Sequence, residues 1–390
     1  MWLCRQNPTT VRCGALKIQG DPEYLGGDDT PAISQGMVTL NIPLVVDGFG
    51  RHNECSDADT ADVGTQVCNI QGEYGYFGGY DNDYGNASIE YVNVNGDANL
   101  TLNALGRGSV LQHFNLISTG SFGSHEKYML EINGGAVNIR DFYYAAENYH
   151  GALKWSYGYV GSIQSAYLTS LYALPNNENG IAAFIKGVNN PEEVDALPRS
   201  APVLANISIN YSSFSSGAQQ TGISLYDGSA VNLYNSVIGS NLDTYYISTL
   251  DQCIYIDDSD GLLTSENINI INMAAGCAEF SNDSRIDEIP VFTGNAVFNW
   301  NYFQLSNAYN NIREAVSGFY EMEPLLKNRQ ASGFSAEFPY REVAVQGNLV
   351  GTNSGDYRDS DTADTEFLEQ TDYLGIFDYN QHSEIVNYLE

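Results

Sequence analysis

The fold is decided by a short phrase that recurs along the chain, and one copy of it reads Ala136-Val137-Asn138-Ile139-Arg140-Asp141-Phe142. Each copy has a small residue, an apolar anchor and then alternating polar and apolar positions, which is the pattern of a half-buried β-strand. The other copies begin at Ser88, Ser109, Ser162, Val203, Ala230 and Asn267. We expect a strand at every copy.

The spacing of these copies predicts how the strands are arranged. The anchors Ile89, Val110, Val137 and Ile163 lie 21, 27 and 26 residues apart. A period in the twenties with strand phrases is typical of a β-solenoid, in which each coil buries its apolar side against its neighbours. A β-sandwich is the alternative, because Asn95-Gly96 and Asn133-Gly134 are turn pairs that antiparallel hairpins use.

The boundaries of the solenoid follow from where the phrase is lost. A step of 40 residues between Ile163 and Val203 predicts a coil with loop insertions near residues 176–180 and 189–193. We assign residues 1–300 to the solenoid with its N-terminal cap. Residues 301–390 are predicted to form an irregular C-terminal cap and tail packed on the solenoid, with a short helix near residues 305–316.

Asparagine is abundant, and a stacked coil gives a reason for this. Asparagine tolerates the left-handed backbone of a coil corner, and amide side chains on successive coils can form ladders of hydrogen bonds. We therefore expect asparagines to stack from one coil to the next.

Composition excludes several classes of function. The 390 residues carry 16 basic and 48 acidic side chains, a net charge of −32. Such a chain repels phosphate backbones and anionic lipids, so nucleic-acid and membrane-surface binding are not expected. No apolar run approaches the length of a transmembrane segment. The 16 Phe and 28 Tyr can build a core, which argues against disorder.

Six cysteines fall into three local pairs, and this grouping predicts three disulfides and an oxidising compartment. The pairs are Cys4 with Cys13, Cys55 with Cys68, and Cys253 with Cys277. None has the spacing of a zinc knuckle.

Several stretches together resemble a known group of proteins. They include residues 67–81, 106–110, 158–164, 203–207, 253–258 and 370–375. In this order they are similar to secreted right-handed parallel β-helix lipoproteins and surface proteins of marine bacteria, which look like the pectate-lyase type of β-helix and are mostly uncharacterised. The resemblance implies a right-handed parallel β-helix and a location outside the cell, and it implies no particular activity.

Enzymes on a β-helix would need acid and base groups on one groove. A polysaccharide lyase would use a basic residue and a carboxylate-bound Ca²⁺, and a glycoside hydrolase would use paired carboxylates. Arg140, His150 and Lys154 are predicted to lie near one coil. The candidate carboxylates are Asp257, Asp258 and Asp260, although acidic residues are also common in solvated turns.

Calcium is the one cofactor that the sequence suggests, because carboxylate-rich loops attract this ion. The candidate ligands are Asp81, Asp83, Asp257, Asp258 and Asp260. Aromatic residues gather in two glycine-rich stretches and are candidates for stacking on sugars. These are Tyr76, Tyr80, Trp155, Tyr157 and Tyr159, and a glycan-binding module would expose the last three in a line.

The leading hypothesis is a non-catalytic β-helix at the cell surface or in the extracellular space, with a structural, adhesive or self-assembling role. Its partners would be other copies of itself or extracellular glycans. The alternatives are a polysaccharide lyase, a glycoside hydrolase, or a glycan-binding module without turnover.

Overall fold

The fold was determined from a computed structural model of the chain. It describes residues 16–20, 38–53, 70–71, 76–79, 82–85, 87–118, 127–146, 150–170, 181–196, 198–211, 219–234, 236–240, 250–257, 268–271, 274–277, 279–283 and 367.

Two long sheets make up the described fold, together with one small hairpin. Sheet 1 contains β1 (Leu16–Gln19), β2 (Val38–Leu40), β6 (Ala87–Asn95), β8 (Val110–Ser118), β10 (Asn138–Ala146), β12 (Ser162–Ser170), β14 (Val203–Tyr211), β16 (Val231–Tyr234), β17 (Val237–Ser240), β19 (Ile268–Ile271) and β20 (Ala274–Gly276). Sheet 2 contains β3 (Leu44–Asp47), β7 (Leu100–Asn103), β9 (Tyr128–Asn133), β11 (Gly151–Ser156), β13 (Ile181–Val188), β15 (Gln219–Tyr226), β18 (Gln252–Ile256) and β21 (Glu279–Ser281). The hairpin pairs β4 (Ile70–Gln71) with β5 (Tyr76–Phe77).

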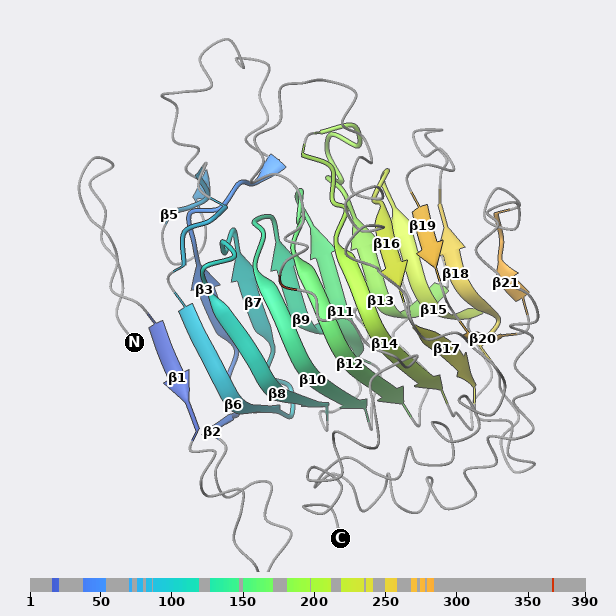
Figure 1. Cartoon of the computed structure of the whole chain (residues 1–390), viewed down its shortest axis with the longest axis horizontal. Helices are drawn as coiled ribbons and strands as arrows, with labels where there is room; N and C mark the ends of the chain where they lie inside the picture. Colours follow the sequence, from blue (N-terminus) through green and yellow to red (C-terminus); the bar gives the residue numbers. More distant parts are fainter. Residues whose placement is uncertain are drawn as a thin grey trace, which may run out of the picture.

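The chain alternates between the two sheets, and successive coils stack side by side (Figure 1). A coil has one strand of sheet 2 and either one strand or two consecutive short strands of sheet 1. Apart from the β4–β5 hairpin, every described strand pair is parallel. Antiparallel pairing between sequence neighbours, which a sandwich requires, is therefore not how these sheets form. The predicted parallel β-helix is confirmed.

All seven copies of the sequence phrase fall on strands of sheet 1, from β6 to β19. Some anchors were placed one or two residues early. The register pairs Ile89 with Leu111 and Leu111 with Ile139, whereas Val110 is 43% exposed. The structural repeat is therefore carried by Leu111 and Ile139 rather than by Val110 and Val137.

One continuous core fills the space between the sheets. The rings of Phe114 and Phe142 stack at 5.4 Å on adjacent coils, and Phe184 meets Tyr144 edge to face. The largest buried side chain, Trp155, donates its indole N–H to Ser229 Oγ at 2.9 Å. Burial of one apolar layer by the next is what makes each coil depend on its neighbours.

Every strand from β6 to β14 in sheet 1 contains one residue with left-handed backbone, and together these form what we call the kink column. They are Tyr91, His113, Asp141, Ser165 and Asn206, with φ between 54° and 63°. They stack because the residues on either side are in register from coil to coil. A left-handed residue inside an extended strand interrupts the ladder and turns the chain.

The predicted asparagine ladders are present. Asn115 donates to Asn93 Oδ1 at 2.8 Å on sheet 1. On sheet 2, Asn133 donates to Asn103 Oδ1, and Asn103 donates to Asp47 Oδ1, both at 2.8 Å. Burial raises the pKa of Asp47, and the hydrogen bond from Asn103 opposes that rise.

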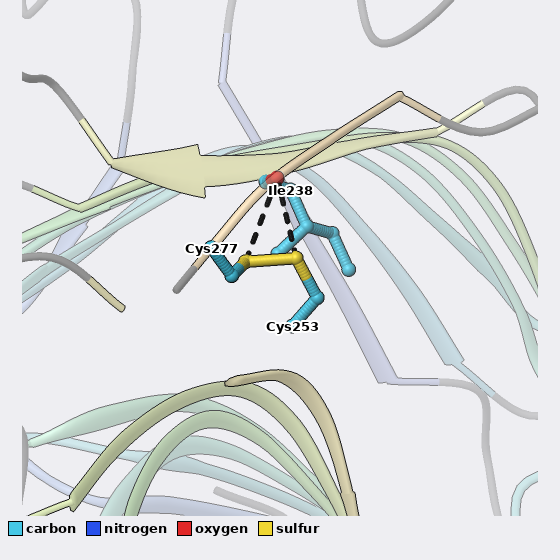
Figure 2. The surroundings of a disulfide bond; sticks show 3 residues. All are labelled: Ile238, Cys253 and Cys277. Atoms are coloured by element: carbon cyan, nitrogen blue, oxygen red, sulfur yellow. Dashed lines mark hydrogen bonds between the residues drawn. A yellow bond between two sulfur atoms is a disulfide. The ribbon is translucent and has the colours of Figure 1, made fainter. Parts of the chain in front are cut away.

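The disulfide between Cys253 and Cys277 is confirmed, and it indicates an oxidising environment. It links β18 of sheet 2 to the residue that follows β20 of sheet 1, beside the carbonyl oxygen of Ile238 (Figure 2). Cys4, Cys13, Cys55 and Cys68 lie outside the described residues.

The structure tests the other predictions only where they fall on described residues. The predicted insertion at residues 189–193 lies in the loop after β13, as expected. The predicted insertion at 176–180 and the C-terminal cap with its helix fall outside the described residues, of which only Phe367 belongs to 301–390. Within the described part, no helix has the length and apolarity to cross a membrane.

Candidate functional site

A row of polar side chains on the outer face of sheet 1 is the best candidate site, and the kink column creates it. Ile89 and Val92 both enter the core although they are three residues apart, because the left-handed residue between them shifts the alternation. Each strand therefore turns two adjacent side chains outward. We call the first three such pairs the polar ridge, formed by Glu90, Tyr91, Gln112, His113, Arg140 and Asp141.

The middle of the polar ridge is an aromatic and charged stack. The rings of Tyr91 and His113 stack with centroids 4.9 Å apart. On the next coil, His113 Nδ1 lies 3.4 Å from Asp141 Oδ2, and the two side chains are 38% and 33% exposed. Burial, together with the charges of Glu90 and Asp141, raises the pKa of Tyr91. The stack thus presents a flat ring, an imidazole and a carboxylate to solvent.

Glu90 is held by its neighbours rather than left free to take a proton. Ser88 Oγ donates to Glu90 Oε1 at 2.8 Å, and Gln112 Nε2 donates to Glu90 Oε2 at 2.9 Å. These hydrogen bonds, from Ser88 first and then Gln112, hold the pKa of Glu90 below its usual value. Glu90 is therefore an ionised acceptor, and it suits recognition of hydroxyl groups better than acid catalysis.

The polar ridge becomes buried towards later coils. Gln164 and Asn206, which continue its two columns, are both buried, and Gln164 Nε2 donates to Asn206 Oδ1 at 3.2 Å. Only the part on β6, β8 and β10 is therefore open to a partner.

The predicted catalytic residues that the structure describes lie on or directly after different strands. Arg140 lies on β10 of sheet 1, whereas Lys154 lies on β11 of sheet 2. Asp257 directly follows β18, three strands along sheet 2 from β11, which at about 4.8 Å per strand is about 14 Å. Asp258 and Asp260 lie outside the described residues. The described residues therefore form no shared groove of Arg140, Lys154 and Asp257.

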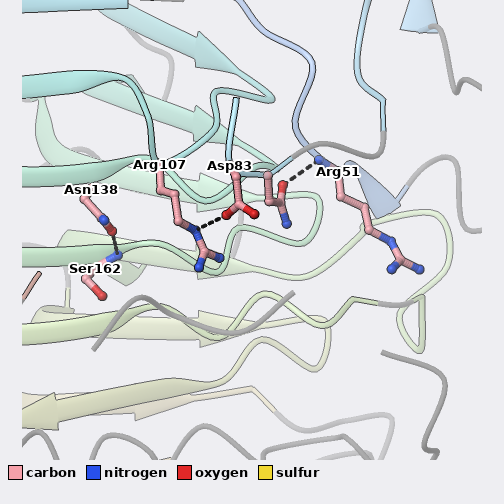
Figure 3. Close-up of polar contacts among 6 residues, drawn as sticks. Arg51, Asp83, Arg107, Asn138 and Ser162 are labelled. Atoms are coloured by element: carbon pink, nitrogen blue, oxygen red, sulfur yellow. Dashed lines mark hydrogen bonds and ion pairs between the residues drawn. The ribbon is translucent and has the colours of Figure 1, made fainter. Parts of the chain in front are cut away.

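Calcium ligation stays a prediction, and one of its candidates is already engaged. Asp83 Oδ1 lies 3.2 Å from Arg107 Nε in an ion pair (Figure 3). Asp81 lies outside the described residues. Within the described part, no three His, Cys, Asp or Glu side chains come together as metal ligands would.

The aromatic prediction needs a correction. Trp155 and Tyr159 are fully buried, and the Tyr159 hydroxyl donates to the carbonyl oxygen of Val137 at 2.8 Å. They belong to the core and offer no ring face to a glycan. Tyr157 is partly buried, with His52 stacked on it at 4.6 Å. Tyr76 lies on β5, and Tyr80 is outside the described residues.

A serine–histidine pair that the sequence did not predict lies between the sheets. Ser118 Oγ is 2.6 Å from His150 Nδ1, and burial lowers the pKa of His150. This resembles a nucleophile and its base. However, Ser118 has 0% exposed surface, so a substrate cannot reach it in this structure. The pair joins the end of β8 to the start of β11 and is structural.

The other set of left-handed residues, which we call the corner column, directly follows strands of sheet 2. Its members are Ala104, Gly134, Tyr157 and Asp227, with φ between 51° and 67°. Residues 48–53, which we call the axial segment, run across this column from coil to coil. Gly50 N–H donates to Ala104, Gly135 N–H donates to Arg51, and Asn53 N–H donates to Tyr157, each to the carbonyl oxygen.

Side chains also fix the axial segment. Arg51 N–H donates to Asn82 Oδ1 at 2.7 Å (Figure 3), and Asn53 Nδ2 donates to Asn189 Oδ1 and to the Pro198 carbonyl oxygen. His52 is buried, and burial lowers its pKa to about 3. The axial segment therefore packs across the first three members of the corner column, Ala104, Gly134 and Tyr157, of which Tyr157 stays partly exposed.

Comparisons with protein-family models, with curated proteins and with solved structures found no match.

Proposed function

We propose that the protein is an extracellular β-helix that acts as an adhesive or structural scaffold, and that it contacts glycans through the polar ridge without turning them over. The observation that carries this proposal is the open stack of Tyr91, His113 and Asp141 beside Glu90. A flat ring can stack on a sugar, and ionised and amide side chains can bind sugar hydroxyls. The disulfide agrees with a location outside the cell.

Two further observations favour binding over catalysis. The carboxylate of Glu90 is committed to hydrogen bonds from Ser88 and Gln112. Arg140 and Lys154, the basic candidates for a lyase, lie on different sheets. A binding surface needs neither group to move a proton, whereas a lyase or hydrolase does.

The test is a panel of neutral and acidic polysaccharides, scored both for retention of the protein and for release of reducing ends or unsaturated products. We expect retention on at least one polysaccharide without product. The double variant Tyr91→Ala, His113→Ala should bind about tenfold more weakly, since one stacking contact and one hydrogen-bonding group are lost. Tyr255→Ala on sheet 2 is the control and should bind normally. Product release, or full binding by the ridge variant, would contradict the proposal.

A further inference from the structure

Phe367, far along the chain from the coils, lies against the outer face of sheet 1. Arg140 Nη2 donates a hydrogen bond to the carbonyl oxygen of Phe367. The guanidinium carbon of Arg140 also lies 4.5 Å from the centroid of the Phe367 ring. One arginine thus holds both the backbone and the side chain of Phe367, and a cation–π contact of this kind is strongest when it is shielded from water.

A second observation concerns the neighbouring part of the same face. Phe142 and Tyr144 point into the core, so Tyr143 between them points outward, and Tyr167 is its register partner on β12. The two rings stack at 5.8 Å. Yet Tyr143 and Tyr167 are only 3% and 5% exposed. Side chains that point away from the core and are still buried must be covered from outside the coils.

The length of the chain allows the C-terminal part to be that cover. From β19 back to β10 is four strand spacings, about 19 Å, which the chain between Asp283 and Phe367 spans easily.

We propose that the outer face of β10 and β12 is a docking surface for the chain's own C-terminal part, which is anchored by Phe367 on Arg140 and covers the stacked rings of Tyr143 and Tyr167. The surface and its occupant are parts of one molecule, so docking is independent of concentration. It also assigns Arg140 to an internal partner, so Arg140 is not one of the ridge residues that we propose to contact a glycan. This inference does not depend on the proposed function.

The experiment uses the full chain and compares wild type with Phe367→Ala, Arg140→Gln and the double variant. The accessibility of each tyrosine is measured by nitration with tetranitromethane and peptide mass spectrometry. We expect nitration of Tyr143 and Tyr167 to rise about five- to tenfold in either single variant, as loss of one shielded cation–π contact allows. Nitration of these tyrosines in the double variant should be little higher than in either single variant, because both changes remove the same contact between Phe367 and Arg140.

The control is built into the molecule. Tyr226 and Tyr255 lie close together on sheet 2, with ring centroids 5.9 Å apart. Tyr226 is buried and Tyr255 is partly exposed, and the nitration of neither should change. Unchanged protection of Tyr143 and Tyr167 in both single variants would overturn the proposal. A parallel rise at both tyrosine pairs would overturn it as well, because it would show a global effect of Phe367 on the fold rather than a local cover.

Discussion

The kink column and the corner column have the same left-handed backbone and different surroundings. The kink column carries Tyr91, His113 and Asp141, whose side chains reach solvent. The corner column is crossed by the axial segment, which approaches so closely that glycine is required beside it. A solenoid repeats its backbone at every coil, and what covers each column decides whether it becomes surface or interior.

The largest expected effect is at the corner. A Cβ on Gly135 would lie 2.3 Å from the carbonyl oxygen of Leu105, and its φ is +75°. Gly135→Val should cost about 4 kcal/mol or more of unfolding free energy, or prevent folding. The control is Ser165→Ala in the kink column, where we expect a loss below about 1 kcal/mol. Urea denaturation measures the unfolding free energy of both variants. Equal losses would contradict the expected difference between the two columns.

Asn53→Ala tests the side-chain attachment of the axial segment. The amide of Asn53 is fully buried and donates to Asn189 at 2.9 Å and to Pro198 at 3.1 Å. Without this amide, Asn189 Oδ1 and the Pro198 carbonyl oxygen each lose a donor, so we expect the unfolding free energy to fall by about 2 to 3 kcal/mol. Asn115→Ala on sheet 1, which removes one partly buried bond, should cost about 1 kcal/mol. A loss near zero for Asn53→Ala would mean that the axial segment is held by its backbone alone.

His52 makes the corner sensitive to acid. Its pKa is about 3 in the folded protein and about 6.5 when unfolded, because burial disfavours the charged ring. The unfolded chain binds the extra proton first, so stability falls as pH drops below about 6.5. This residue should contribute about 2 kcal/mol of loss between pH 7 and pH 5. His52→Gln should lose less stability over that range than wild type, and His113→Gln in the kink column serves as the control.

The smallest effect is expected at the polar ridge. Asp141→Asn removes the charge that faces His113 at 3.4 Å, with both side chains about a third exposed. Solvent screens such a pair, so unfolding free energy should change by less than about 0.5 kcal/mol. Thermal denaturation at neutral pH provides the measurement. A loss above about 1 kcal/mol would mean that the ridge is a structural element and not a free surface.

The solenoid could be predicted because seven strands of sheet 1 carry a recurring phrase of apolar and polar residues. The phrases did not predict the strands of sheet 2, since segments such as β11 carry several apolar residues without that repeat. The kink column was missed because two adjacent polar residues, such as Gln112 and His113, look like a flaw in the alternation. Their apolar neighbours Leu111 and Phe114 are three apart, and this spacing was the available signal.

The candidate site was harder to predict than the fold. Trp155 seemed a sugar contact, yet Leu153 lies two residues earlier on the same face of β11, and both enter the core. The partly exposed Lys154 between them marks the outer face. Which outer columns are covered depends on contacts across hundreds of residues, such as Arg140 with Phe367, and local patterns carry no information on these.

The axial segment also affects how the protein folds during its synthesis. The coils of a solenoid can fold one after another as the chain leaves the ribosome, because each coil contacts only its neighbours. The side-chain hydrogen bonds of Asn53, however, need Asn189 and Pro198, which are translated 136 and 145 residues later. The side chain of Asn53 therefore remains without these hydrogen bonds until residue 198 has been synthesised, and the bonds then connect the axial segment to later coils.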